Sequence, residues 1–277
     1  MESLALRILC PQWGFEHLDM EDFLDKVKKS GFDGIDTWVP PDRKGRVRLR
    51  RLLEEYDLTM VSQQYQAEGK NIKEFCKSFD YYLQLSAETN PLLINSHSGR
   101  DSFSLQDQLK VLDTAFMFEH KSNIAVAHET HRGRLAFSPG NAQQLFNKRK
   151  QMRITADLSH WVCVTESYLP YFESTLKQAI ERTIHVHARV GHPQGPQVPD
   201  PRLPAWSESL NQFSTWWSRI IESHRNKGTS RLTFTTEFGP PPYMWTHKRN
   251  NAPVASQWEL NLYIKSLLKE IAASSSI

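Results

Sequence analysis

The chain has 277 residues, of which 39% are hydrophobic and 23% charged, with a formal net charge of +3. This composition is typical of a folded protein with a large apolar core, and it argues against disorder away from the chain ends. The small net charge gives no indication of nucleic-acid binding. The three cysteines are widely spaced and odd in number, which argues against a disulfide framework or a structural zinc motif and predicts a reducing compartment.

The first residues, Met1 to Pro11, include an acidic side chain and lack an apolar run of signal-peptide length. No segment approaches the roughly 18 apolar residues that cross a membrane. We therefore expect a cytoplasmic protein that binds a small molecule, with no nucleic acid and no membrane as partner. The sequence leaves open whether the chain forms a homo-oligomer. The basic run Arg43–Arg51 is either a phosphate-binding patch or a solvated helix start, and its lack of interleaved aromatic residues favours the helix.

Short β-rich apolar runs alternate along the chain with longer segments of helical periodicity, a pattern typical of parallel βαβ units. Eight strands are expected, at Leu4–Cys10, Gly34–Val39, Leu58–Gln63, Pro91–Ser96, Asn123–Glu129, Arg153–Leu158, Thr183–Ala188 and Arg231–Glu237. A helix is expected after each strand, at Met20–Ser30, Arg46–Tyr56, Asn71–Ala87, Ser104–His120, Pro139–Lys150, Tyr168–Glu181, Ala205–Asn226 and Val254–Ala273. This count predicts a single α/β domain, a (β/α)8 barrel over residues 1–277 with a frayed tail at 271–277.

Ionisable residues stand at the ends of four consecutive expected strands. They are, in order from the fifth strand to the eighth, Glu129, Asp157, His187 and Glu237. The carboxyl ends of the strands form the catalytic face of such a barrel, so these side chains should meet. Any one of them alone is more often a structural hydrogen-bonding group, but four together are costly to bury unless a cation compensates for them. We therefore predict one divalent metal ion; this ligand set suits Mn or Mg, with Zn, Fe or Co also compatible.

Other polar residues near the strand ends are candidates for contacts with a substrate. His160 follows Asp157 by three residues and is expected in a loop, while His185 alternates with His187, so both should point into the barrel. Arginines in this region match carboxylate or phosphate groups and indicate an acid-bearing substrate, unless they pair with Glu166, Glu181 or Asp200. The candidate substrate-binding residues are Gln64, His97, His131, Arg134, His160, His185, Arg189 and Arg202. Candidate pocket walls are Trp13, Trp38, Gln63, Trp161, Trp206, Phe238 and Tyr243.

The quartet just described resembles, in residue type and strand order, the metal ligands of the xylose isomerase-like (AP endonuclease family 2) barrels. This family includes ketose 3-epimerases, hydroxypyruvate isomerases and endonuclease IV. The histidine three residues after Asp157 and the run His185-Val186-His187 are also similar, and Arg202 to Trp206 loosely match a downstream basic and Pro-Trp pattern. The resemblance extends over essentially the whole chain.

The resemblance implies an enzyme, an isomerase or epimerase of carbohydrate metabolism. Its substrate would be a sugar, a sugar acid or a related hydroxy-carbonyl compound, converted through an enediolate. Glu129 and Glu237 would act as base and acid on opposite faces of that intermediate.

Three other functions stay open at this point. A lyase, a dehydratase or a C-glycoside-cleaving enzyme would use the same metal and the same bases. A phosphodiesterase resembling endonuclease IV is less well supported, because Asp200-Pro201-Arg202 has arginine where that group has histidine, and the second strand has no histidine. A binding protein without catalysis is disfavoured by the complete quartet.

Overall fold

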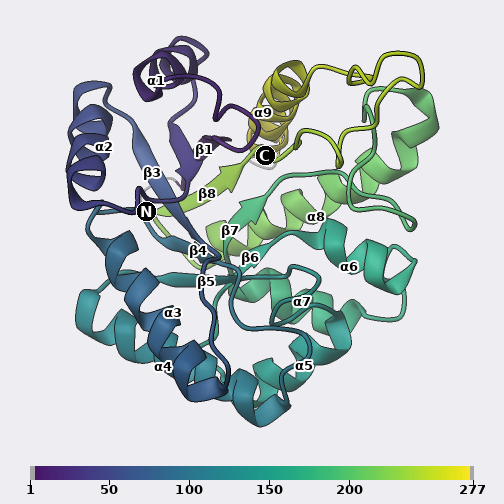
Figure 1. Cartoon of the computed structure of the whole chain (residues 1–277). Helices are drawn as coiled ribbons and strands as arrows, with labels where there is room; N and C mark the ends of the chain where they lie inside the picture. The colour runs from purple at the N-terminus through teal and green to yellow at the C-terminus, as the bar shows by residue number, and fades with distance from the viewer. Residues whose placement is uncertain (1–3, 275–277) are drawn as a thin grey trace.

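Eight parallel strands, each paired with the next along the chain, form a sheet that closes where β8 pairs with β1. The computed structural model describes residues 4–274. Figure 1 shows the strands at the centre and the helices around them. The strands are β1 (Ala5–Pro11), β2 (Gly34–Thr37), β3 (Thr59–Gln64), β4 (Ile94–Ser96), β5 (Val126–Glu129), β6 (Ile154–Ala156), β7 (Thr183–His187) and β8 (Arg231–Thr235). The expected (β/α)8 barrel is confirmed.

The helices follow the strands in chain order. They are α1 (Met20–Lys29), α2 (Arg43–Glu55), α3 (Ile72–Ala87), α4 (Leu105–Ser122), α5 (Pro139–Lys148), α6 (Leu158–Thr165), α7 (Glu173–Arg182), α8 (Ser207–Asn226) and α9 (Gln257–Ser274), with a 3-10 turn, η1, at Pro204–Trp206. Side chains of Asp42, Asn71, Ser104 and Ser138 accept a hydrogen bond from the first turn of the helix that each precedes. Such caps satisfy backbone N–H groups that have no partner inside a helix.

Helix α6 is absent from the expected elements and corrects the expectation that His160 lies in a loop. The side chain of Asp157 accepts hydrogen bonds from the backbone N–H and the hydroxyl of Ser159, so it caps a helix that starts directly after β6. His160 therefore lies in the first turn of α6. At the other end of the chain, α9 continues to Ser274, and the remaining residues of the expected frayed tail, 275–277, lie outside the described part of the chain.

Apolar side chains fill two regions. The larger cluster lies between the barrel and its helices and includes Phe23, Phe79, Phe118 and Trp216. A smaller cluster of Leu9, Val61, Leu93 and Ala127 alternates along the strands with the side chains of the first cluster, as inward positions do on a barrel strand. The barrel interior is thus sealed by packed side chains below its polar end.

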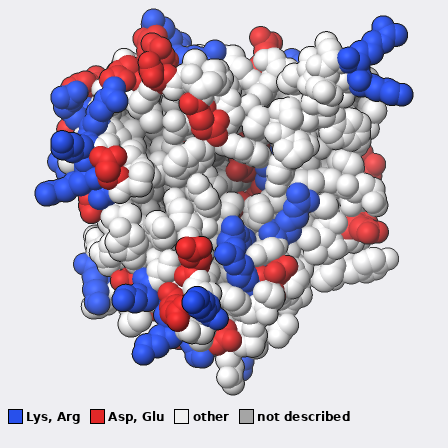
Figure 2. Space-filling view, viewed as in Figure 1, with Lys and Arg blue, Asp and Glu red and all other residues white. Residues whose placement is uncertain are grey.

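The basic run 43–51 forms most of α2, as the helical interpretation predicted. Figure 2 shows its Lys and Arg side chains interleaved with carboxylates on that side of the molecule. Arg48 pairs with Glu21, and Arg50 and Arg51 pair with carboxylates one turn along their own helix. Within residues 4–274, no helix combines the length and hydropathy needed to cross a membrane.

Candidate active site

The four residues of the quartet converge at the carboxyl end of the barrel. Glu129 ends β5 and His187 ends β7, while Asp157 and Glu237 follow β6 and β8 directly or within two residues. One ligand atom from each residue lies within 4.8 Å of the corresponding atoms of the others, and all four side chains are buried. Closure of the barrel therefore brings together residues that are up to 108 positions apart (237 minus 129) in the sequence.

Several polar atoms in this cluster have no hydrogen-bond partner among the described residues. Glu129 Oε1, His187 Nδ1 and Glu237 Oε2 are buried and unpartnered in this sense. His187 Nδ1 lies 2.8 Å from Glu237 Oε2 and 3.5 Å from Glu129 Oε2 without making a hydrogen bond. Buried polar atoms normally have partners, and three oxygen donors with one imidazole nitrogen suit a divalent cation. The residues present therefore fit the metal ion predicted from the sequence.

The pKa values reflect the crowding of negative charge. Burial alone would lower the pKa of His187, but the carboxylates of Glu237 and Glu129 raise it well above its ordinary value. Burial would raise the pKa of Glu129, yet the fields of His97 and His187 hold it well below its usual range. A proton on His187 thus supplies positive charge that the carboxylates require. A metal ion would supply that charge instead, because a coordinating imidazole is neutral.

Arg189, a candidate substrate-binding residue, lines the cavity beside the quartet and is the second cation of this cluster. Its side chain is 2% exposed, contacts Asp157 and lies 3.4 Å from Glu237. None of the pairings with Glu166, Glu181 or Asp200 is formed by Arg189 among the described residues. Arg189 also lies over the Tyr243 ring, 4.8 Å from its centroid.

Three histidine rings, tilted against one another, lie in a row beside the quartet. The ring centroids of His97 and His131 are 4.5 Å apart, and those of His131 and His160 are 3.9 Å apart. Burial lowers the pKa of His131 to about 3 and that of His160 well below its ordinary value. Both rings are therefore neutral at pH 7, which allows them to pack this closely. His97 Nε2 lies 2.9 Å from Glu129 Oε2 and links the row to the quartet.

A cavity of about 190 Å³ reaches the quartet through Glu237. Its aromatic walls are Trp13, Trp38, Tyr65 and Tyr243, and its polar lining is Gln63, His97, His131, Arg189 and Glu237. Of the candidate walls, Trp161 and Phe238 are instead fully buried in the core. Apolar walls with a few convergent polar groups are typical of small-molecule sites.

Some candidate substrate-binding residues lie elsewhere. Gln64 is buried beside Ser96, 2.8 Å from its hydroxyl, and its neighbour Gln63 lines the cavity instead, because successive strand residues point to opposite faces. Arg202 is partly exposed and pairs with Asp200, 2.8 Å away. Arg134 is half-buried and is not among the cavity-lining residues. His185 lies deeper in the barrel, 3.4 Å from Asp36.

Sequence reasoning missed Asp36 and Asn95, which both contact the quartet. Asp36, on β2, lies 3.0 Å from His187 Nε2, and Asn95, on β4, donates a hydrogen bond of 2.8 Å to Glu129. Their only signal in the sequence is a polar residue at an inward position of a short apolar strand. That signal does not say which distant strand end the side chain reaches.

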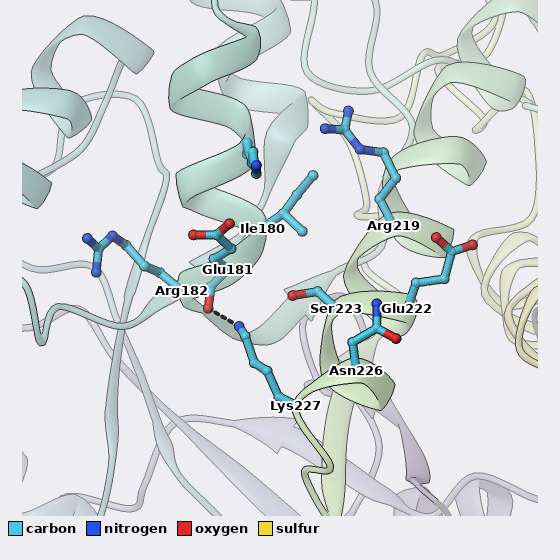
Figure 3. Close-up of a pocket in the computed structure, with 9 residues that line it drawn as sticks. Ile180, Glu181, Arg182, Arg219, Glu222, Ser223, Asn226 and Lys227 are labelled. Carbon is cyan, nitrogen blue, oxygen red and sulfur yellow. Dashed lines mark hydrogen bonds between the residues drawn. The ribbon is translucent and has the colours of Figure 1, made fainter.

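A larger hollow, of about 630 Å³, lies between α7 and α8 (Figure 3). This hollow lies at the amino-terminal end of the strands, opposite the quartet, because its lining residues Arg182 and Lys227 come just before β7 and β8. Lys227 donates a hydrogen bond to the backbone oxygen of Glu181, and Arg219 pairs with Glu173. Two of its lining cations, Lys227 and Arg219, are thus engaged with neighbouring groups, and this end of such barrels serves stability rather than catalysis.

The family comparison matches residues 24–204 with the xylose isomerase-like TIM barrel, also called AP endonuclease family 2. The chain belongs to this family. No curated protein matches it in sequence.

Solved structures of low sequence identity share the fold. A probable 3-DHS dehydratase from Bacillus anthracis has a TM-score of 0.61 and 14% identity, covering 95% of this chain and 98% of that one. The 3-keto-D-glucoside 4-epimerase from E. coli has a TM-score of 0.61 and 12% identity, covering 96% and 100%. A sugar phosphate isomerase/epimerase from Parabacteroides distasonis has a TM-score of 0.60 and 13% identity, covering 99% and 96%.

Proposed function

We propose that the chain is a divalent-metal-dependent isomerase or epimerase acting on a sugar, a sugar acid or a related hydroxy-carbonyl compound. The observation that supports this most strongly is the buried quartet, whose unpartnered oxygen and nitrogen atoms face one another beside a small cavity. Membership of the xylose isomerase-like family supports the same reaction class.

In this proposal Glu129, Asp157, His187 and Glu237 hold the cation. When bound, a divalent cation polarises the oxygens of a carbonyl and a neighbouring hydroxyl and thereby acidifies the carbon between them. The aromatic walls orient the carbon skeleton of the substrate, while Gln63 and His131 reach its hydroxyl groups from the polar side of the cavity.

Proton transfer is assigned to the two glutamates. Glu237 lines the cavity and is 7% exposed, so its carboxylate can reach a substrate carbon directly. Glu129 is 1% exposed. It accepts a hydrogen bond from Asn95 and contacts His97 Nε2, and these two contacts orient its carboxylate. Two carboxylates on different strands can give and take a proton from different sides of a flat intermediate.

The test is proton exchange, which can be measured before the product is identified. The purified chain, loaded with Mn²⁺ or Co²⁺, is incubated in D₂O with panels of ketoses, keto acids and sugar acids. Deuterium at the carbon beside the carbonyl, together with an isomer or epimer, supports the proposal. Loss of water from the substrate identifies a dehydratase or lyase instead, and absence of exchange across the three panels contradicts the proposed reaction class.

A further inference from the structure

Asp36 is a buried carboxylate that none of the proposed steps uses. It lies on β2, on a different strand from every member of the quartet, and is 4% exposed. Its Oδ2 atom lies 3.0 Å from His187 Nε2 and accepts a hydrogen bond of 2.8 Å from the hydroxyl of Thr235. Asp36 therefore contacts the far side of the one imidazole in the quartet.

The two nitrogens of His187 face different partners. Nε2 faces Asp36, whereas Nδ1 faces Glu129 and Glu237 and has no hydrogen-bond partner among residues 4–274. An ionised carboxylate can only accept a hydrogen bond, so the bond to Asp36 requires a proton on Nε2, whereas Nδ1 makes no hydrogen bond to the carboxylates it faces. In the neutral ring this leaves the Nδ1 lone pair directed at the quartet.

One neighbouring contact tests this assignment. Asn95 Nδ2 lies 3.3 Å from His187 Nε2, and an amide nitrogen would require Nε2 to accept. The same amide makes a shorter bond, 2.8 Å, to Glu129 Oε2, while Asp36 is closer to Nε2 and has no proton to give. The shorter distances and the charge both favour a donating Nε2, and the Asn95 contact is then incidental.

We propose that Asp36 is a positioning residue that fixes the tautomer and ring orientation of His187, so that Nδ1 is the metal-binding atom. This inference rests on the metal site of the proposed function. Ligating histidines commonly donate their second N–H to a carboxylate, and loss of that partner typically weakens metal affinity by about 10- to 100-fold. Asp36 acts through His187 and does not line the cavity.

The test compares Co²⁺ affinity, by calorimetric titration, in the wild type and in two variants. Asp36→Asn keeps the shape of the side chain but can donate to Nε2, which would shift the ring proton to Nδ1. Thr235→Val removes the other hydrogen bond to the same oxygen and leaves the carboxylate in place. We expect Asp36→Asn to bind Co²⁺ about 10- to 100-fold more weakly. Thr235→Val should stay within a few-fold of wild type.

A second measurement needs no variant at Asp36. Long-range ¹H–¹⁵N correlation spectra of the Zn²⁺-loaded wild type report the tautomer of each histidine, with His187→Gln identifying the His187 signals. A protonated Nε2 on His187 is the expected result; a protonated Nδ1, or equal Co²⁺ affinity in Asp36→Asn and wild type, overturns the inference alone. A wild type that binds no divalent cation overturns the proposed function as well.

Discussion

Arg189, which lines the cavity, forms an ion pair with Asp157. The pair is closed to solvent, because the two side chains have exposed fractions of 2% and 0%. Removing one partner of such a pair leaves an uncompensated buried charge. Here that charge would stand beside Glu129 and Glu237, so Arg189 stabilises the fold and the site together.

Arg189→Met should lower the free energy of unfolding of the metal-free protein by about 3–5 kcal/mol. Added Mn²⁺ should restore part of that loss, because a cation that binds only the folded state stabilises it. Urea unfolding with and without Mn²⁺ measures both effects. Arg202→Met is the matched control, since it breaks a partly exposed pair worth about 1 kcal/mol or less. An Arg189→Met protein as stable as the control would contradict this account.

Glu129→Gln and Glu237→Gln should each reduce kcat by at least about 100-fold, as expected for loss of a general acid or base. Glutamine keeps the shape of each side chain and cannot transfer the proton. Steady-state kinetics on the substrate found in the exchange screen measure the effect. Glu222→Gln, an exposed residue of α8, should keep wild-type turnover. Near-normal turnover in either site variant would refute its role in proton transfer.

Gly239→Ala should raise KM without changing metal affinity. A Cβ atom at residue 239 would collide with the Trp13 ring, which forms one wall of the cavity. Trp13 offers no metal ligand, so Co²⁺ titration should be unchanged. Gly140→Ala serves as control, because a Cβ there meets no atom within 4 Å. Unchanged KM in Gly239→Ala would show that Trp13 does not shape the substrate site.

His224 gives a prediction for stability against pH. It is buried on α8, 2.7 Å from the backbone oxygen of Thr183, and burial lowers its pKa below the ordinary value of 6.5. The unfolded chain therefore binds a proton on His224 more readily than the folded chain does. The stability that the neutral, buried His224 ring contributes is present above about pH 6.5 and is lost as the pH falls below that value. Urea unfolding at pH 7.5 and 5.5 should show a smaller loss in His224→Gln than in wild type. Equal losses would exclude His224 as a contributor.

The barrel and its quartet could be predicted because both depend on local pattern. Each strand is a short apolar run, and parallel closure of eight such strands brings their carboxyl ends together whatever the intervening sequence. Glu129, Asp157, His187 and Glu237 each follow such a run, so the sequence pattern was enough to predict that they meet.

Features that depend on contacts across the barrel could not be predicted. Asp36 and His187 are 151 residues apart, and nothing in the four residues of β2 indicates that this aspartate reaches β7. The burial of Arg189 depends on the path of the loop after β7. Both Gln63 and Gln64 were candidates, and only Gln63 lines the cavity, because neighbouring residues of a strand point to opposite sides and the sequence does not say which side faces the cavity.

Metal content tests the central claim most directly. The protein is equilibrated with Mn²⁺ or Co²⁺, freed of loose ions by gel filtration and examined by elemental mass spectrometry, alongside an Asp157→Ala/His187→Ala double variant. We predict about one ion per chain in the wild type, as expected for a four-ligand site, and none in the double variant. A wild type without metal, or a double variant that retains it, would contradict the assignment of the quartet as a metal site.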